Sequence, residues 1–180
     1  MGQLSQQVKD SLNGLIKVIN ESEGELQVLI STSMIGIMSK RMFNYNEGSK
    51  NAAGESLGVY SPEYKAAKTA DHGAMLAAKV NLYATGTLYN SVKQVKSGGN
   101  TYVAVTDVKY PSTPPTTKTR KDGTTYQTKG SANGQSTVEV AGYLNNQYGE
   151  IFAPTKEEIK EIEIIGDKFV KRKTDEYYNQ

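Results

Sequence analysis

The chain has 180 residues, which is enough for one domain with a modest core. Its hydrophobic content is only 37%, so long segments of the chain are polar. The net charge of +2 gives no global electrostatic reason for nucleic-acid binding, and the absence of cysteine excludes disulfides, thiolate catalysis and cysteine-based metal sites. A single histidine, His72, excludes a multi-histidine metal site.

Two helices are predicted in the N-terminal part of the chain. Residues 3–20 carry apolar side chains at steps of three and four, which places them on one helix face: Leu4, Val8, Leu12, Leu15 and Ile19. Gly14 is expected to cost this helix about 1 kcal/mol relative to Ala. A second helix is predicted over 23–43, with Ser22 as its N-cap and Glu25 completing a capping box.

A loop and a short helix are predicted next. Residues 44–60 are rich in Gly and Asn and form a loop that is long for a compact domain, as is typical of functional or disordered segments. Ser61 and Pro62 then begin a short helix that ends near Gly73, because Ser is a favourable N-cap and Pro fits the first helical position.

Residues 75–108 have the composition of strands. Alternation is weak over 79–83, and residues 85–87 form a turn. Residues 91–96 and 101–106 are β-prone and flank a Ser-Gly-Gly-Asn sequence, so they predict a β-hairpin.

Residues 109–136 change character to a segment rich in Pro, Thr, Gly and Lys. This composition is typical of a flexible arm, while Asp122-Gly123 between Thr- and Tyr-rich flanks is typical of the tip of a projecting hairpin. Under either interpretation the segment is an excursion from the core.

Two more helices are predicted towards the C-terminus. Residues 137–149 form a short helix that is stopped by its final glycine. Thr155 caps the last helix, and Glu158 completes its capping box. The apolar stripe of this helix ends at Phe169, and residues 170–180 are expected to be a charged tail that frays or docks elsewhere.

No group of residues has the pattern of a catalytic site. The carboxylates of the last helix alternate with Lys156 and Lys160, as on a solvated helix face. His72 is accounted for by the favourable position of a cation at a helix C-terminus. The glycine-rich loop 48–58 lacks the spacing and the following Lys-Ser/Thr pair of a phosphate-binding loop. We therefore expect no enzymatic activity, no cofactor and no metal.

One local charge bias stands out within residues 109–129, where these basic residues gather: Lys109, Lys118, Arg120, Lys121 and Lys129. A solvated flexible loop would explain them, and so would contact with an acidic partner or with phosphates. Only Tyr126 accompanies them as an aromatic platform for stacking on bases.

Targeting signals are not apparent in the sequence. The N-terminus lacks the charged-then-apolar pattern of a secretion signal, and the longest apolar run is far short of a membrane span. We expect a soluble protein that stays in the compartment where it is made. The expected organisation is a single domain over 1–180, with an N-terminal helix at 1–22, an inserted arm at 109–136 and a C-terminal tail at 170–180.

Four motifs follow one another along the chain. They are Arg41-x-Phe43 before a glycine-spaced loop, Leu57-Gly58-x-Tyr60-Ser61-x-x-Tyr64, Val80-Asn81-Leu82-x-x-Thr85-Gly86-x-Leu88-x-x-Ser91, and Tyr148-Gly149-x-Ile151-Phe152. In this order and at these separations, the motifs resemble the small head-to-tail joining proteins of tailed bacteriophages and prophages. These include tail-completion and Mu-type virion morphogenesis proteins, in the lineages of phages with Bacteroidetes hosts.

The resemblance covers roughly residues 26–165 and implies an α+β fold, with helices packed on a small antiparallel sheet, long loops and a projecting arm. It implies a structural virion protein, a head-tail connector or tail-completion subunit. Copies would form a ring in the neck around the channel that DNA crosses. The implied partners are the protein itself and portal or tail proteins, with no membrane. The implied location is the virion neck, after assembly in the host cytoplasm.

The resemblance carries over no catalytic residues. The segment 109–136 departs from the family pattern, which has a shorter hairpin there, so its role stays open, as does a portal-proximal or tail-side position. We expect loops 44–60 and 109–136 to contact neighbouring subunits or partners. The residues expected in these contacts are Arg41, Phe43, Tyr45, Leu57, Tyr60, Tyr64, Tyr126, Tyr148 and Phe152.

The basic residues of 109–129 are expected to face the DNA channel or an acidic partner. Two competing hypotheses remain. One is a nucleic-acid-binding protein that grips through 109–129, and its binding would fall steeply with salt. The other is a small hydrolase or carbohydrate-binding module, for which the 12 tyrosines are the only support.

Overall fold

A computed structural model describes residues 2–44, 46–72, 79–82, 86–110, 117–119, 123–127 and 134–179. Contacts between residues divide the chain into two compact units. Unit 1 comprises residues 1–38, 94–103 and 154–180, and unit 2 comprises residues 39–93 and 104–153. The sequence predicted a single domain over 1–180.

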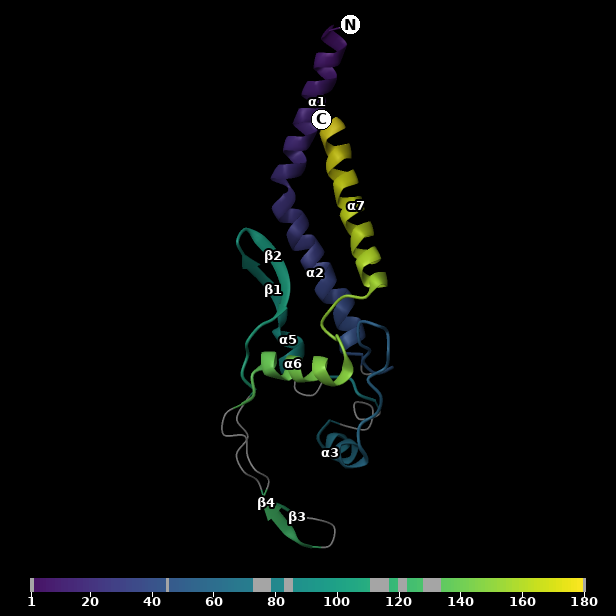
Figure 1. Ribbon diagram of the computed structural model, residues 1–180. Coiled ribbons are helices and arrows are strands. Elements are labelled where there is room, and N and C mark those ends of the chain that lie inside the picture. Colours follow the sequence, from purple (N-terminus) through teal and green to yellow (C-terminus); the bar gives the residue numbers. More distant parts are fainter. Residues whose placement is uncertain are drawn as a thin grey trace. The chain divides into compact units, whose positions relative to one another are not determined.

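The fold is α+β, as the sequence predicted, with helices packed on a small antiparallel sheet (Figure 1). The helices described are α1 (Gly2–Glu21), α2 (Glu23–Met42), α3 (Pro62–His72), α5 (Thr87–Ser91), α6 (Thr137–Tyr148) and α7 (Lys156–Tyr178). The strands are β1 (Val92–Ser97), β2 (Asn100–Val105), β3 (Thr117–Thr119) and β4 (Thr125–Gln127). They pair as β1 with β2 and β3 with β4.

Unit 1 is built on the packing of α7 against α1, which lie side by side in Figure 1. The Tyr177 hydroxyl donates a hydrogen bond of 3.1 Å to the Ser11 carbonyl oxygen. Ile162 and Phe169 of α7 are buried and lie on its inner face, whereas Ile159, at the start of the predicted apolar stripe, is 42% exposed.

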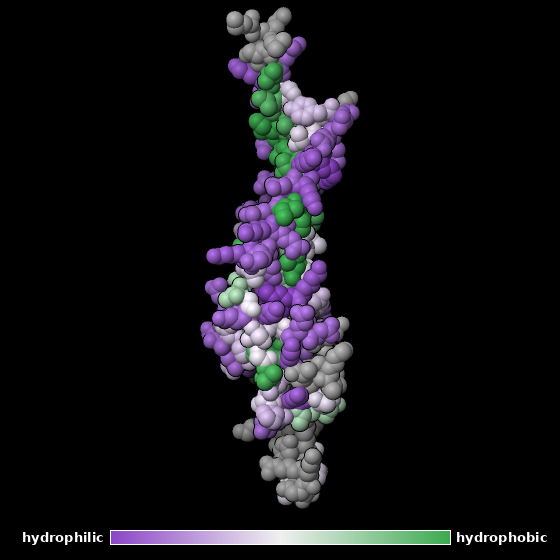
Figure 2. Space-filling view, turned by 90° about the vertical axis from the view of Figure 1, so that its right-hand side faces the viewer, coloured by the Kyte–Doolittle hydropathy of each residue, from purple (hydrophilic) through white to green (hydrophobic). Residues whose placement is uncertain are grey.

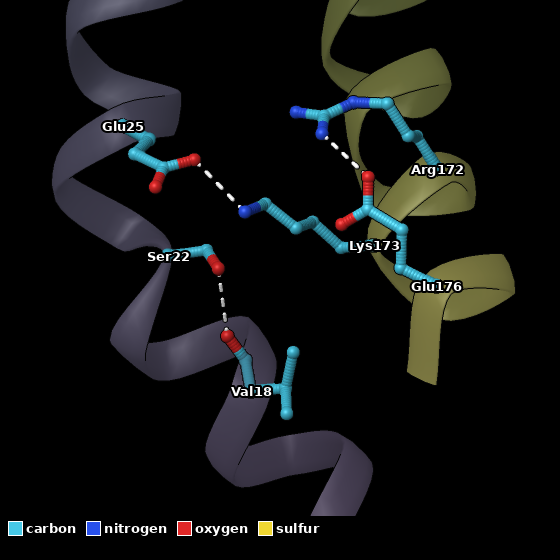
Figure 3. A network of polar contacts seen from close by, with 6 residues as sticks. All are labelled: Val18, Ser22, Glu25, Arg172, Lys173 and Glu176. Carbon is cyan, nitrogen blue, oxygen red and sulfur yellow. Dashed lines mark hydrogen bonds and ion pairs between the residues drawn. The ribbon is translucent and has the colours of Figure 1, made fainter. Parts of the chain in front are cut away.

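At the junction between α1 and α2, the predicted capping box of Ser22 and Glu25 is wrong. The N–H and hydroxyl of Ser22 both donate to the Val18 carbonyl oxygen, at 3.1 and 2.9 Å, and the Leu26 N–H donates to the Ser22 carbonyl oxygen. Helical hydrogen bonding therefore continues through Ser22. Its hydroxyl is bonded to a carbonyl oxygen four residues earlier and cannot cap α2. The Glu25 carboxylate faces Lys173 of α7 instead, at 2.9 Å (Figure 3).

The tail beyond Phe169 was predicted to fray or to dock elsewhere. It is helical to Tyr178 and contacts α1 and α2, so fraying is wrong and docking describes it better. Arg172 forms an ion pair of 2.7 Å with Glu176 one turn later along α7 (Figure 3). The hydrogen bond and positive charge of Lys173 hold the pKa of the Glu25 carboxyl below its usual range. Contacts with α1 and α2 thus hold the last turns of α7 in place.

The predicted β-hairpin is confirmed, with β1 and β2 joined by a two-glycine turn. Gly98 and Gly99 both have positive φ, at 57° and 83°, the conformation of a type I′ turn that matches the twist of the paired strands. Within unit 1, the Gln94 amide donates to the Thr32 hydroxyl at 2.6 Å and to the Val28 carbonyl oxygen at 3.1 Å. These bonds fix β1 to α2.

Unit 2 has an apolar core of its own. Its buried apolar side chains are Met42, Phe43, Leu57, Val80, Leu88, Val92, Ala141 and Ile151. Helices α5 and α6 are in contact (Figure 1). The predicted caps of α6 and α7 are confirmed, since Gly149 follows α6 with φ of 79° and Thr155 forms a capping box with Glu158.

Two predictions for unit 2 are modified by its structure. Residues 79–82 form no strand, because Val80 bonds with the preceding loop: its N–H donates to the Gly58 carbonyl oxygen and its own carbonyl accepts from the Ser49 N–H. Residues 83 and 85 lie outside the described residues. In the segment 109–136, the described part favours the hairpin, since β3 and β4 pair with Lys118 opposite Tyr126.

Gly14 makes room for Tyr177 where α1 meets α7. A Cβ added at Gly14 would overlap with the Tyr177 hydroxyl, whereas a Cβ at Gly24 of α2 would meet nothing within 4 Å. Gly24→Ala should stabilise the protein by up to about 1 kcal/mol through helix propensity alone. Gly14→Ala should be at least about 1 kcal/mol less stable than Gly24→Ala, because it displaces Tyr177. Urea unfolding of both variants measures this difference, and equal stabilisation would rule out a spacing role for Gly14.

Candidate functional site

Arg41, expected at a partner contact, is hydrogen-bonded within unit 2. Its Nη1 atom donates to the carbonyl oxygens of Lys50 at 2.9 Å and Ile151 at 3.1 Å, and its Nη2 atom donates to that of Ala153 at 2.7 Å. The planar guanidinium suits this fork of acceptors. Arg41 therefore joins the last turn of α2 to two segments more than a hundred residues apart in sequence.

Loop 44–60 is held by contacts of its own unit. The side chain of Asn51 donates to Glu55 at 2.8 Å and to the Tyr148 carbonyl oxygen at 2.9 Å, and the Ala52 N–H donates to the Glu150 carbonyl oxygen. The Ser49 hydroxyl donates to the Met42 carbonyl oxygen. The loop is thereby fixed to the last turn of α2 and to the end of α6.

The aromatic and apolar residues expected at partner contacts fall into two groups. Phe43 and Leu57 are buried in the core of unit 2, where Phe43 packs edge-on against Tyr89 with ring centroids 5.1 Å apart. Their burial within one chain accounts for them without a partner. Tyr64 is 51% exposed, and Tyr60, Tyr148 and Phe152 are half-buried. Tyr45 and the side chain of Tyr126 lie outside what the structure describes.

A pocket of about 660 Å³ lies within unit 2. Its walls come from the residues around α3, from residues 80, 82 and 88, from Tyr110 and from α6. The described residues that line it are Val59, Tyr60, Ser61, Tyr64, Lys68, Val80, Leu82, Leu88, Tyr110, Val140, Tyr143, Leu144, Gln147 and Tyr148. Five of these are tyrosines, so the pocket combines aromatic faces with hydroxyl groups. Three of them, Tyr60, Tyr64 and Tyr148, belong to the residues that the sequence singled out.

Lys68 of α3 is the charged residue of this lining, and its side chain is buried. Its Nζ atom donates to the Tyr60 hydroxyl at 2.6 Å and to Asn81 Oδ1 at 2.8 Å. The Tyr60 hydroxyl also accepts from the Asn81 N–H at 3.1 Å. Lys68, Tyr60 and Asn81 thus form a closed polar cluster in the wall of the pocket.

Burial changes the acidity of several groups around the pocket. It lowers the pKa of the Lys68 ammonium from the ordinary 10.5 to about 8, because a buried cation has lost its hydration. Burial raises the pKa of Tyr60 and Tyr110, and burial with the nearby charges of Tyr143 and Tyr60 raises that of Tyr148. Lys68 therefore titrates at a pH where these tyrosines remain neutral.

The basic residues expected to face DNA or an acidic partner are only partly described. Lys109 is exposed and its backbone forms a bridge with Ser136. Lys118 lies on β3, paired with Tyr126 on β4. Arg120, Lys121 and Lys129 lie outside the described residues.

An exposed apolar stripe runs along α1 in unit 1, visible as a row of hydrophobic atoms in Figure 2. Val8, Leu12 and Ile16 are 54%, 49% and 57% exposed, and each is separated from the next by about one helical turn. Ile16 was not part of the single apolar face predicted from the sequence. Val8 and Leu12 belong to that predicted face and are nevertheless exposed, while Ser11 and Gly14 are the residues of α1 that meet Tyr177 of α7.

Sequence reasoning missed Lys68 and the polar role of Asn81. Lys68 lies in a helix that reads as polar, Lys-Ala-Ala-Lys-Thr-Ala, and no local pattern distinguishes it from the exposed Lys65 one turn earlier. Only the position of the helix on the pocket makes one lysine buried and the other solvated. Asn81 had been noted as part of a motif, without a partner.

Comparison of the chain with protein-family models, with curated proteins and with solved structures finds no match. Within the described ranges, acidic and histidine side chains do not gather in a group of three or more that could hold a metal ion. Likewise, none of the helices that the structure describes is long and apolar enough to cross a membrane.

The hydrogen bonds of Arg41 predict its contribution to stability. Arg41→Met leaves three carbonyl oxygens without this donor and should lower the free energy of unfolding by about 2–4 kcal/mol. Lys40→Met removes the same charge from the exposed neighbouring position and should change it by less than about 0.5 kcal/mol. Urea unfolding compares the two. If Arg41→Met unfolds like the wild type and loses only association, Arg41 serves a partner and not its own unit.

The lowered pKa of Lys68 predicts how stability varies with pH. Above pH 8 the folded state loses the Lys68 proton while the unfolded state keeps it up to about pH 10.5, so the unfolding free energy should rise between pH 8 and 10. The gain is at most about 3 kcal/mol, since one pKa unit corresponds to about 1.4 kcal/mol. The raised tyrosine pKa values oppose it only above about pH 10.

The measurement is the urea midpoint of the wild type, Lys68→Met and Lys65→Met between pH 7.5 and 9.5. Lys65→Met should keep the rise, because Lys65 is exposed, and Lys68→Met should lack it. An equal rise in all three proteins would assign it to another group.

Proposed function

We propose that this chain is a structural subunit of a bacteriophage neck, which assembles as a ring between portal and tail as a head-tail connector or tail-completion protein. The proposal starts from the resemblance of its ordered motifs to head-to-tail joining proteins. The observation that carries it is the exposed stripe of Val8, Leu12 and Ile16 on α1. A second copy of the chain is the occupant that we assign to this stripe.

The stripe supports self-association on physical grounds. Burial of apolar surface contributes about 25 cal/mol per Å², so three large side chains at successive turns supply a useful part of an interface. The exposed polar positions of α1 carry both signs of charge, with Lys9 and Lys17 against Asp10 and Glu21. Mixed charges allow a copy of the chain to approach without net repulsion at this helix. A ring needs such a surface to meet a different surface of the next subunit.

The proposed ring assigns roles to the other residues that were expected at partner contacts. Tyr64 and Phe152 keep exposed or half-exposed surface and can serve contacts with portal, tail or neighbouring copies. Arg41, Phe43 and Leu57 would support these contacts indirectly, by holding unit 2 in shape.

Light scattering of the full chain over a range of concentrations tests the proposal, alone and with portal or tail proteins. The wild type should form a closed oligomer, either unaided or on addition of a partner. Leu12→Glu places a charge in the stripe and should reduce the assembled fraction at least tenfold, about 1.4 kcal/mol in association free energy. Asn13→Glu adds the same charge at the next exposed position and should assemble like the wild type.

Two outcomes would overturn the proposal. One is a monomer that ignores both kinds of partner. The other is assembly of Leu12→Glu at wild-type strength, which would exclude the stripe as the interface.

Nucleic-acid binding remains the second candidate, because Lys109 is exposed and a hairpin carries Lys118. A chain that stays monomeric but binds DNA with a steep dependence on salt would favour it. Lys109→Gln should then reduce the salt slope by about one unit.

A further inference from the structure

The tyrosine-lined pocket of unit 2 has a feature that the proposed ring does not use. Its volume of about 660 Å³ is in the range of sites for small organic ligands. Aliphatic and tyrosine side chains make up most of the lining residues, and the charged group among them, Lys68, is hydrogen-bonded to the Tyr60 hydroxyl. A few placed polar groups in an apolar lining are the usual composition of a ligand site.

Lys68 carries the only positive charge in the described lining, and that lining contains no carboxylate. The partners of its ammonium, the Tyr60 hydroxyl and Asn81 Oδ1, are neutral dipoles. An ammonium donates three hydrogen bonds, and the described structure gives Lys68 two of them. A buried cation without an opposite charge is costly, so an anion that accepts the third hydrogen bond would gain from both charge and contact.

The lining also indicates the charge of the ligand and the shape of its uncharged part. One cation compensates one negative charge, which fits a carboxylate better than a doubly charged phosphate. The rings of Tyr60 and Tyr64 lie 4.9 Å apart at a tilt of 48°, and Tyr143 is 64% exposed at the pocket. Aromatic faces in these positions suit stacking or edge contacts with a flat ring.

We propose that this pocket binds a monocarboxylate attached to an aromatic ring, with Lys68 as the group that holds the carboxylate. Tyr60 and Asn81 position the Lys68 ammonium, and the tyrosines of α3 and α6 contact the ring. The carboxylate has two sources of the same chemistry, a free aromatic acid or the C-terminal carboxylate of a protein segment that ends in an aromatic residue.

The test uses phenylacetate as the probe and phenylacetamide as its neutral match, with binding to the full chain measured by calorimetry at pH 7. Phenylacetate should bind at least tenfold more tightly than the amide. Lys68→Met should abolish this preference, whereas Lys65→Met, which removes an exposed lysine of the same helix, should retain it. Equal affinity for acid and amide, or a preference that survives Lys68→Met, would overturn the proposal.

Should Lys68→Met fold poorly, the comparison of acid with amide on the wild type still tests the proposal, and a second variant tests the aromatic part of the lining. Tyr143→Ala shortens an exposed side chain at the pocket and should weaken acid and amide by similar factors while the preference for the acid remains. A specific site would bind phenylacetate well below about 10 mM. If the wild type binds no phenylacetate at that concentration, the proposal is also refuted.

NMR of the unmodified protein with isotope-labelled lysines gives an independent readout. In the free protein Lys68 should titrate near pH 8, and phenylacetate should raise its pKa, because the bound carboxylate favours the charged ammonium. Tyr60, Tyr64, Tyr110, Tyr143 and Tyr148 surround the pocket as the other titratable groups of its described lining. An unchanged lysine titration at saturating phenylacetate would place the probe elsewhere.

A further binding experiment with a peptide distinguishes the two sources of the carboxylate. A short peptide with a free C-terminal phenylalanine should bind at least tenfold more tightly than phenylacetate if a protein segment is the natural ligand, and its C-terminal amide should lose that gain. Weaker binding of the peptide than of phenylacetate would assign the pocket to a free acid. Neither result depends on ring assembly, so failure of the neck proposal leaves this one standing.

Discussion

The guanidinium of Arg41 and the three carbonyl oxygens that it holds determine the architecture of unit 2. Carbonyl groups of this unit that lie outside its helices and strands need donors from elsewhere. Arg41 supplies them from the last turn of α2, to Lys50 on one side and to Ile151 and Ala153 on the other. The neighbouring Asn51 then binds the Tyr148 carbonyl oxygen and fixes the end of α6. The pocket wall that α6 supplies depends on the same bonds.

Most of the regular elements could be predicted from the sequence because their signals are local. Apolar spacing marks α2 and α7, capping residues mark the start of α7 at Thr155, and the two glycines of the β1–β2 turn mark the hairpin. These signals act within a few residues, so no knowledge of the tertiary structure is needed to use them.

The errors and omissions share one cause, which is a partner distant in sequence. Glu25 reads as half of a capping box, and its actual partner, Lys173, lies at the other end of the chain. The same contact explains why α7 stays helical where the sequence predicted fraying. For the candidate site, the sequence located Tyr60, Tyr64 and Tyr148, but it could not show that a lysine of an ordinary polar helix would be buried between them.

The bond between Asn51 and Tyr148 spans 97 residues and that between Ser11 and Tyr177 spans 166, and this has a consequence for the order of folding. Contacts of such high sequence separation are slow to form, because a long chain must close before they stabilise anything. During synthesis the first third of the chain leaves the ribosome without the segments that complete either unit. Phe43 thus lacks its ring contact until Tyr89 has emerged and Asn51 lacks its bond to Tyr148 until later still, and the nascent protein is most prone to aggregation in that interval.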